Sequence, residues 1–507
     1  MIKLVVYPVL VALIGWYSIN TSHADPFDIS TLQVGIEHVD GMALDDFNGD
    51  NAQDILLVGR DASKQKQLQI ITLNQGKPVK YQAEVVTLDN AVLFFDTAKL
   101  AGNDKQTLLF LQPGRVMRYD VADKKLHLLL NVDTIYRHSV QQTTALSQLT
   151  FAIDINGDGL SDFILPDFKQ NWVFIQRPEG GFAAPQALEV LAEMRLFRNK
   201  SAVYAGSPVF LADFNFDGEA DLIFRSKSDL LVFFQHEGVF TTKAKKVTLD
   251  LALPLTDDYD DLNKDHSDKV THSFFRLSDL NNDNILDLVT KVTKSSGFFD
   301  KSSQYQFYFG KESGRKSSKK SDRKSEVEFP QKPDSVISSE GLQFELTLVD
   351  INGDNTLDLV SPSYELGVGS IISSLFSSSA DLDVMFHPLH NGTYQTKANL
   401  EKELTVDFDL SSGQQVYPLL KISDFDGDGH KDLLLGHGSK KIYLYKGVNG
   451  GRLFAKRSQR FKIPLPRDGH LVTHKDLNND GKTDLVIRYD KLDGQGLGNS
   501  MKILLAR

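Results

Sequence analysis

Asp424-Phe-Asp-Gly-Asp-Gly-His-Lys-Asp432 is one of seven copies of a nine-residue pattern in this chain of 507 residues. Each copy reads Asp, apolar residue, Asn or Asp, any residue, Asp, Gly or Asn, two further residues, and Asp. Side-chain oxygens at positions 1, 3, 5 and 9, with a backbone carbonyl near position 7, suit a hard cation that takes six to eight oxygen ligands. One such stretch could be a solvated acidic turn, but seven copies in register predict about seven calcium sites.

The predicted metal ligands are the side chains at positions 1, 3, 5 and 9 of every copy. They are Asp46, Asn48, Asp50, Asp54, Asp154, Asn156, Asp158, Asp162, Asp213, Asn215, Asp217, Asp221, Asp279, Asn281, Asp283, Asp287, Asp350, Asn352, Asp354, Asp358, Asp424, Asp426, Asp428, Asp432, Asp476, Asn478, Asp480 and Asp484. Position 6 is always Gly or Asn, the residues that most readily adopt the left-handed backbone that a loop around an ion requires.

The residues that flank each copy predict strands. Positions 2 and 10 are apolar in all seven copies, so we expect both ends of the loop to be anchored in a core. Short apolar runs precede and follow the loops, as is typical of strands bounded by turns. No copy has the acidic residue at position 12 that an EF-hand needs. Each copy therefore predicts a strand, a metal-binding turn and a second strand.

The spacing of the copies predicts the architecture. They start 108, 59, 66, 71, 74 and 52 residues apart, and the first interval contains Lys99–Thr107, a similar frame in which only Asn103 remains of the four side-chain ligands. All-strand repeats of about 50–70 residues are typical of a β-propeller. We expect an all-β fold, a single β-propeller of eight blades over residues 25–507, with calcium loops between the first and second strands. Seven blades is the alternative, if Lys99–Thr107 is part of an elaborated loop.

The last copy predicts how the ring closes. It is followed by two apolar runs, Leu485–Tyr489 and Met501–Leu505, which supply only its second and third strands. The segment near Ile29–Val34 is free to provide the fourth strand. Pairing of the two ends would leave no open sheet edge.

The repeated loop inside strand-rich repeats resembles the FG-GAP/VCBS-type repeat of bacterial exported proteins and of the integrin α-subunit propeller. The resemblance covers residues 25–507. It implies a calcium-binding β-propeller whose loops lie on one face, with ligands docking mostly on the opposite face. The chain departs from the integrin pattern because it has no inserted metal-dependent adhesion domain and because the frame at Lys99–Thr107 lacks its ligands.

Residues 1–24 are predicted to be a signal peptide, cleaved after Ala24. Lys3 precedes the apolar stretch Leu4–Gly15, which is too short to span a bilayer, and small residues lie at the predicted cleavage site. The chain has no Cys, so neither disulfides nor a lipidated Cys is expected. We therefore expect a periplasmic or secreted protein without a transmembrane segment.

The formal net charge of −11 has a local source, since the seven loops hold 23 of the 67 acidic residues, namely 22 Asp and Glu219. The acidity therefore reflects metal binding and does not indicate a basic partner, and no nucleic-acid binding is expected.

Three further segments carry expectations. Residues 310–328, rich in Lys and Arg, are predicted to be a basic flexible insertion. Gly367–Leu382 has apolar residues at helical spacing, which predicts a short helix. His470 and His474 would share one face of a strand, as polar strand residues or, alternatively, as a transition-metal pair.

The leading functional prediction is a non-enzymatic, monomeric binding module for a protein or glycan at the bacterial envelope. The sequence contains no familiar catalytic motif, such as G-x-S-x-G or H-E-x-x-H. A polysaccharide lyase or related carbohydrate enzyme on the same propeller is the alternative. The partner is expected on the face opposite the calcium loops. The candidate loops there are Glu189–Gly206, Thr256–Val270, Gln331–Gln343, Glu403–Tyr417 and Pro464–His470.

Overall fold

The chain folds entirely into β-structure in the part that the computed structural model describes. The described residues are 25–79, 84–136, 145–196, 202–256, 269–295, 301–313, 325–340, 342–343, 346–364, 379–407, 417–450, 452–494 and 496–507. They form strands and a short 3₁₀ turn over Gly469–Leu471, and no α-helix lies among them. The all-β prediction is confirmed. None of these residues belongs to a helix long and apolar enough to cross a membrane.

A unit of four antiparallel strands recurs eight times in these residues, and we number the units sheet 1 to sheet 8. Sheet 1 comprises β2 (His38–Asp45), β3 (Asp54–Arg60), β4 (Lys66–Ile71) and β7 (Val85–Thr87); sheet 2, β8 (Phe94–Lys99), β9 (Gln106–Gln112), β10 (Arg115–Asp120) and β11 (Lys125–Asn131); sheet 3, β13 (Ala152–Ile153), β14 (Asp162–Pro166), β15 (Asn171–Phe174) and β16 (Gln186–Leu188); sheet 4, β19 (Val209–Ala212), β20 (Asp221–Ser226), β21 (Asp229–Phe233) and β24 (Lys245–Thr248). Sheet 5 comprises β25 (Lys269–Ser278), β26 (Asp287–Ser295), β27 (Lys301–Tyr308) and β30 (Ser335–Glu340); sheet 6, β32 (Thr347–Val349), β33 (Asp358–Tyr364), β34 (Ser379–His387) and β37 (Leu400–Asp407); sheet 7, β38 (Leu420–Ser423), β39 (Asp432–His437), β40 (Lys441–Tyr445) and β41 (Gln459–Lys462); sheet 8, β42 (Val472–Lys475), β43 (Asp484–Arg488), β44 (Ser500–Ala506) and β1 (Phe27–Gln33).

Short additional strands accompany the eight sheets. β12 (Ser147–Gln148) runs parallel to β8, β31 (Leu342–Gln343) pairs with β33, and a single parallel bridge between Thr405 and His437 joins sheets 6 and 7. Five two-stranded ribbons are also described. They are β5 (Leu73–Asn74) with β6 (Lys77–Pro78), β17 (Glu193–Leu196) with β18 (Ala202–Ala205), β22 (Gln235–His236) with β23 (Val239–Phe240), β28 (Lys311–Ser313) with β29 (Glu326–Glu328), and β35 (Leu389–His390) with β36 (Thr393–Tyr394).

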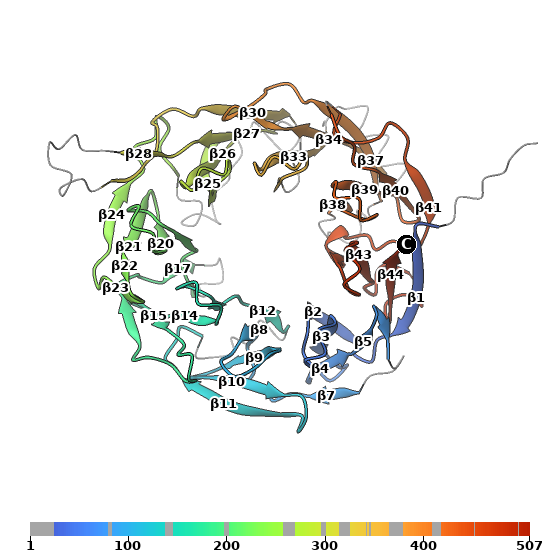
Figure 1. Cartoon of the computed structure of the whole chain (residues 1–507), viewed down its shortest axis with the longest axis horizontal. Coiled ribbons are helices and arrows are strands. Elements are labelled where there is room, and N and C mark those ends of the chain that lie inside the picture. Colours follow the sequence, from blue (N-terminus) through green and yellow to red (C-terminus); the bar gives the residue numbers. More distant parts are fainter. Residues whose placement is uncertain are drawn as a thin grey trace, which may run out of the picture.

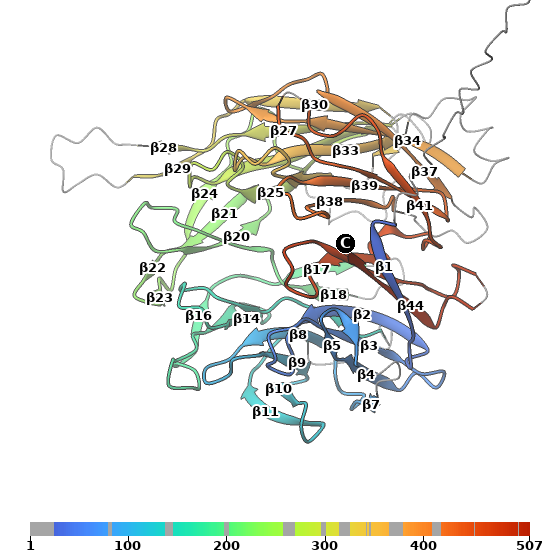
Figure 2. The same cartoon turned by 45° about the vertical axis from the view of Figure 1, so that its right-hand side comes forward.

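The sheets follow one another in chain order around a ring (Figure 1). The ends of the ring meet because β1 pairs antiparallel with β44, from Phe27 opposite Ala506 to Gln33 opposite Ser500. Both views show the first strand beside the last (Figures 1 and 2). The predicted pairing of the N-terminal segment with the last repeat is confirmed.

Each hairpin has the register that the repeated loop imposes. The residue just before position 1 pairs with position 9, as in Ala212 opposite Asp221 and Ser423 opposite Asp432. Lys99 and Gln106 close a similar hairpin in sheet 2, so the prediction that this frame keeps the hairpin is confirmed.

The hydrophobic core consists of clusters between neighbouring sheets. The second strands are buried on both faces, which is why their sequences are apolar runs without alternation, as in Asp54–Arg60. One cluster joins Leu57 of sheet 1 to Val486 and Ile503 of sheet 8, and another joins Phe27 to Leu434 of sheet 7. The apolar residues at loop positions 2 and 10 are all buried, with at most 4% of their surface exposed, as predicted.

Four local predictions need correction or restriction. Of the basic insertion 310–328, the described ends form the β28–β29 ribbon at the rim of the ring, while residues 314–324 lie outside the described part (Figure 2). The helix predicted over Gly367–Leu382 is wrong at its end, because Ser379–Leu382 belongs to β34, and its remainder lies outside the described residues. His470 and His474 do not share a strand, since His470 lies in the 3₁₀ turn and stacks on Tyr417 at 4.0 Å. The predicted signal peptide, residues 1–24, also lies outside the described residues.

Candidate metal centres

The seven predicted metal loops connect the first and second strands of seven sheets, and we number each loop after its sheet. They are loop 1 (Asp46–Asp54), loop 3 (Asp154–Asp162), loop 4 (Asp213–Asp221), loop 5 (Asp279–Asp287), loop 6 (Asp350–Asp358), loop 7 (Asp424–Asp432) and loop 8 (Asp476–Asp484). Sheet 2 carries Lys99–Thr107 at the same place, which we call the Lys99 frame.

The carboxylates at positions 1 and 5 accept hydrogen bonds from backbone N–H groups of their own loop and so stabilise its bend. In all seven loops the position-1 carboxylate accepts the N–H of position 6 at 2.8–3.0 Å. The position-5 carboxylate accepts the N–H of position 7 at 2.8–2.9 Å. This path requires a positive φ at position 6, and the Asn and Gly residues there have φ between 63° and 93°. The predicted backbone role of position 6 is confirmed.

A second left-handed position in each loop was not predicted. Position 4 also has positive φ in every loop, and it is Gly or Asn in six of them. The exception is Phe216 in loop 4, whose φ of 59° is strained for a bulky residue. Gly and Asn at position 4 were the signal that could have identified this second bend.

The position-9 aspartate is a predicted ligand, and its hydrogen bonds also link two parts of the sheet. It is fully buried in all seven loops. One oxygen accepts the N–H of position 2 at 2.8–3.2 Å. The other accepts an N–H at or just beyond the end of the sheet's third strand, at 2.7–3.2 Å. The carboxylate therefore ties the loop to a third strand, a role that the sequence did not indicate.

Burial raises the pKa of these position-9 carboxyl groups. Desolvation is the largest cause, nearby loop aspartates add to it, and the two backbone N–H groups oppose it. The pKa rises to about 6 in six loops and to about 7 for Asp287. A bound cation would favour the charged form and reverse this shift.

The oxygens that face one another in the loops fit a calcium ion chemically. In loop 7, carboxylate oxygens of Asp424, Asp426 and Asp432 all lie within 4.8 Å of one another. In five loops the Asn at position 3 donates its side-chain N–H to the carboxylate at position 5, at 3.0–3.2 Å, and its amide oxygen would have to turn toward a bound ion. A carboxylate offers about four lone-pair sites, so the position-9 group can accept two N–H groups and still ligate a metal. Hard oxygen donors of this kind are those that calcium prefers.

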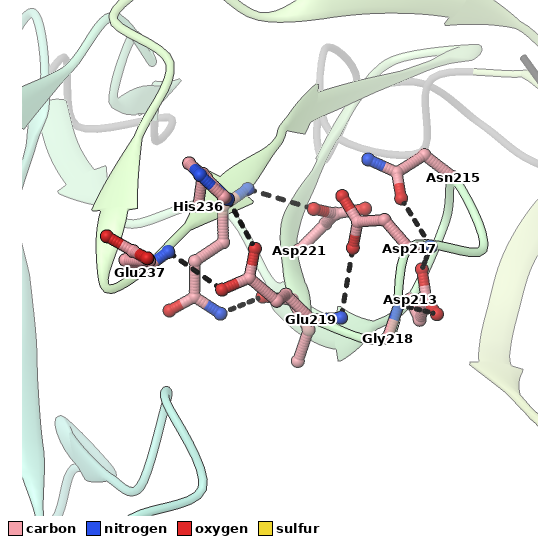
Figure 3. A network of polar contacts seen from close by, with 10 residues as sticks. Asp213, Asn215, Asp217, Gly218, Glu219, Asp221, His236 and Glu237 are labelled. Atoms are coloured by element: carbon pink, nitrogen blue, oxygen red, sulfur yellow. Dashed lines mark hydrogen bonds and ion pairs between the residues drawn. The ribbon is translucent and has the colours of Figure 1, made fainter. Parts of the chain in front are cut away.

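Loop 4 is tied to a neighbouring hairpin by the side chain at position 7 (Figure 3). Glu219 contacts the His236 Nδ1 at 3.0 Å and accepts the N–H of Glu237 at 2.7 Å. These contacts hold the β22–β23 ribbon against the loop. A groove of about 860 Å³ lies beside it, with Phe216 and Asp217 of the loop in its lining.

Loop 7 carries four aspartates and also has a cation of its own. The sequence offered little to neutralise this charge, but the Lys446 ammonium forms an ion pair with Asp426. The hydrogen bond with Asp426 raises the pKa of Lys446. Lys446, which directly follows the third strand, therefore offsets part of the negative charge of this loop.

The Lys99 frame holds an ammonium group where the other loops have an acid. Lys99 occupies position 1, and its Nζ donates to the Asp104 carbonyl at 3.1 Å. Thr107 replaces the position-9 aspartate, and Asn103 donates to its hydroxyl at 3.4 Å. Gln176 of sheet 3 accepts the N–H of Ala101 at 2.7 Å. The frame therefore has an ammonium group and a hydroxyl group where the other loops have the carboxylates of positions 1 and 9.

The two hydrogen bonds of the position-9 aspartate should stabilise the protein even without a metal. In EDTA, Asp221→Ala is expected to lower the free energy of unfolding by about 2–4 kcal/mol, because the N–H groups of Phe214 and Gln235 lose their acceptors in the interior. Asp217→Ala is the control, since its carboxylate accepts an N–H in an exposed part of the loop. Denaturant unfolding in EDTA measures both variants. Equal losses would contradict a special role for position 9.

Comparisons with known proteins place the repeated loop in a family. A sequence model described as FG-GAP-like repeat matches residues 154–224 and 424–487, which include loops 3, 4, 7 and 8. No curated protein matches the chain.

Similar solved structures include an Agrocybe aegerita lectin, described as recognising non-reducing terminal N-acetylglucosamine, with 14% identity, a TM-score of 0.38, and coverage of 76% of this chain and 92% of the lectin. Another is the V. cholerae biofilm matrix protein Bap1, with 10% identity, a TM-score of 0.29, and coverage of 92% of this chain and 77% of Bap1. Similarities this remote carry no argument about this chain. The family match therefore rests on the loops themselves, and it identifies residues 154–224 and 424–487 of this chain as FG-GAP-like repeats.

Proposed function

We propose that this protein is a calcium-stabilised β-propeller of eight blades, one blade for each of sheets 1 to 8, that acts as an exported binding module. The proposal is supported by the family match, by the ring of sheets (Figure 1) and by the pairing of β1 with β44. Loops 1 and 3 to 8 each bind one calcium ion, and the Lys99 frame binds none. Cleavage after Ala24 releases the exported chain.

The residues of each loop have separate tasks in holding the ion. The side chains at positions 1, 3, 5 and 9 supply oxygens, and a backbone carbonyl near position 7 completes the set. The intraloop hydrogen bonds favour a backbone conformation that surrounds the site, and a bound ion would hold the loop in that conformation. The ion supplies positive charge that offsets the repulsion between the clustered carboxylates.

A substitution in loop 7 tests the assignment of the ion. Asp428→Ala removes the position-5 ligand and is expected to abolish binding of one calcium ion and to cost about 1–3 kcal/mol of stability. Faster hydrogen exchange over Ile422–Leu435 would locate the effect. The matched control is Asn103→Ala at position 5 of the Lys99 frame, which should leave the number of bound ions unchanged. Equal effects of the two substitutions would contradict the assignment.

The binding function rests on an apolar cluster at the end of sheet 3 away from its loop. β14 runs from Asp162 of loop 3 to Pro166, and Phe168 follows in the next turn. Phe168, Leu191 and Tyr204 are 41%, 71% and 39% exposed. The rings of Phe168 and Tyr204 meet edge to face at 4.9 Å, and Ala192 donates its N–H to the Phe168 carbonyl at 3.2 Å. Grouped exposed aromatic residues are typical of binding surfaces.

We propose that a protein or glycan partner docks on this cluster. Leu191 and Tyr204 lie in the segment Glu189–Gly206, one of the loops predicted for partner binding. A rigid ring suits this role, since it holds the aromatic rings without a loss of order on binding.

Glycan-array and envelope-extract binding by the protein beginning at Asp25 test the proposal. The Phe168→Ala/Tyr204→Ala variant should lose the bound partner. Leu128→Ala, which removes a 55%-exposed side chain from the edge strand β11, is the control and should not. Binding that survives the double substitution would contradict the assigned surface. Cleavage of acidic polysaccharides would favour the lyase alternative.

A further inference from the structure

Main-chain hydrogen bonds connect some of the metal loops directly to the next loop around the ring. Thr483 at position 8 of loop 8 donates its N–H to the Asp424 carbonyl at position 1 of loop 7, at 2.8 Å. Leu357 of loop 6 likewise donates to Leu280 of loop 5, at 2.7 Å. The same connection joins the Lys99 frame to loop 1 and loop 3 to the Lys99 frame, in both cases at 2.9 Å. Each of these four pairs of neighbouring loops is therefore joined by a main-chain hydrogen bond.

The connection between loops 7 and 8 is reinforced by side chains. The hydroxyl groups of Ser423 and Thr483 lie 2.7 Å apart. Ser423 directly precedes Asp424, while Thr483 lies between Lys482, whose carbonyl is the predicted position-7 ligand, and the buried Asp484. Both partners of this contact are thus held by residues that would surround an ion.

Loops 3 and 4 provide a contrast within the same protein. In the described chain no backbone hydrogen bond joins residues 154–162 to residues 213–221. Among the described residues, loops 3 and 4 have the same ligand pattern as loops 7 and 8 but lack the main-chain hydrogen bond between them.

We propose that loops 7 and 8 bind calcium cooperatively, each ion raising the affinity of the neighbouring loop. The inference rests on the proposed calcium function. An ion in loop 8 fixes positions 7 to 9, and with them the N–H and hydroxyl of Thr483. These groups hold the backbone of Asp424, whose carboxylate already accepts the N–H groups of Gly427 and Gly429. Loop 7 then loses less conformational freedom when its own ion binds, which is positive coupling.

Hydrogen exchange of the full chain at increasing calcium concentration tests the proposal, because it reports each loop separately. In the wild type, loops 7 and 8 are expected to become protected at similar concentrations. Asp480→Ala, which removes a ligand of loop 8, should raise the calcium concentration for half-protection of residues 424–432 about fivefold or more. The matched control is Asp217→Ala in loop 4, which should leave the midpoint of residues 154–162 unchanged.

A second variant keeps every metal ligand. Thr483→Val removes the hydroxyl that contacts Ser423 and should shift the midpoint of residues 424–432 in the same direction by a smaller factor. An unchanged loop 7 midpoint in both variants would overturn the coupling. If loop 3 responds to Asp217→Ala as loop 7 does to Asp480→Ala, coupling through the Thr483 contact is also overturned. A wild type in which calcium protects no loop would overturn the proposed calcium function, and the coupling with it.

Discussion

Removal of calcium with EDTA is expected to lower the melting temperature of this protein sharply. A ligand that binds only the folded state at 100 times its dissociation constant adds roughly 2.7 kcal/mol of stability per site. With seven loops this contribution is large compared with a typical net stability of about 5–15 kcal/mol. Chelation also leaves clustered carboxylates without a counter-ion, and their repulsion adds to the loss.

Thermal unfolding with calcium, with EDTA, and with EDTA followed by excess calcium measures this effect. The melting temperature should fall with EDTA and recover when calcium is restored. Calorimetric titration should give about seven sites, with dissociation constants in the range of extracellular modules, about 10⁻⁴–10⁻³ M. A stoichiometry well below seven, or a melting temperature that does not respond to EDTA, would contradict the calcium assignment.

Deletion of Asp25–Val34 is expected to destabilise the far end of the chain. The deleted segment contains β1, whose residues Phe27 and Leu32 are each 2% exposed. Its backbone forms the outer edge of sheet 8, with further hydrogen bonds from Val34 to Asn499 and from Arg507 to Pro26. Without it, β44 becomes an open edge next to an exposed core. Such an edge can pair with a second chain, so self-association should accompany the loss of stability.

Hydrogen exchange of Ser500–Ala506 and light scattering after size-exclusion chromatography measure the two consequences. Point substitutions in β1 measure how much side-chain packing contributes to stability when the pairing of β1 with β44 is kept. Leu32→Ala removes a buried side chain and should cost about 2–5 kcal/mol. Ile29→Ala on the same strand is the control, because this side chain is 46% exposed and should contribute little. Unchanged exchange of Ser500–Ala506 after the deletion would contradict the closure.

The conformation of the seven loops could be predicted from the sequence because most of their structure is local. In loop 7 the bonds from Gly429 to Asp424 and from His430 to Asp428 all close within nine residues. The positive φ of position 6 is determined by the same short stretch. Strands on either side follow from apolar runs too short for helices. Even the strand partner of β44 was predictable, because the repeat count left one strand without a partner and one segment free.

The sequence by itself determined the repeat, the loop conformation and the all-β fold, whereas the tertiary structure decided how the loops are connected to the rest of the protein. The second bond of the position-9 aspartate reaches a residue between 14 and 31 positions away, as in Asp162 with Gln176 and Asp358 with Leu389. The contacts of Glu219 with His236 and of Asp426 with Lys446 likewise join a loop residue to a residue beyond the end of the third strand. The lengths of the intervening connections differ from sheet to sheet, so no fixed sequence offset marks these partners. Only the packing of the strands brings them within hydrogen-bonding distance, and the same packing exposes Phe168 beside Tyr204.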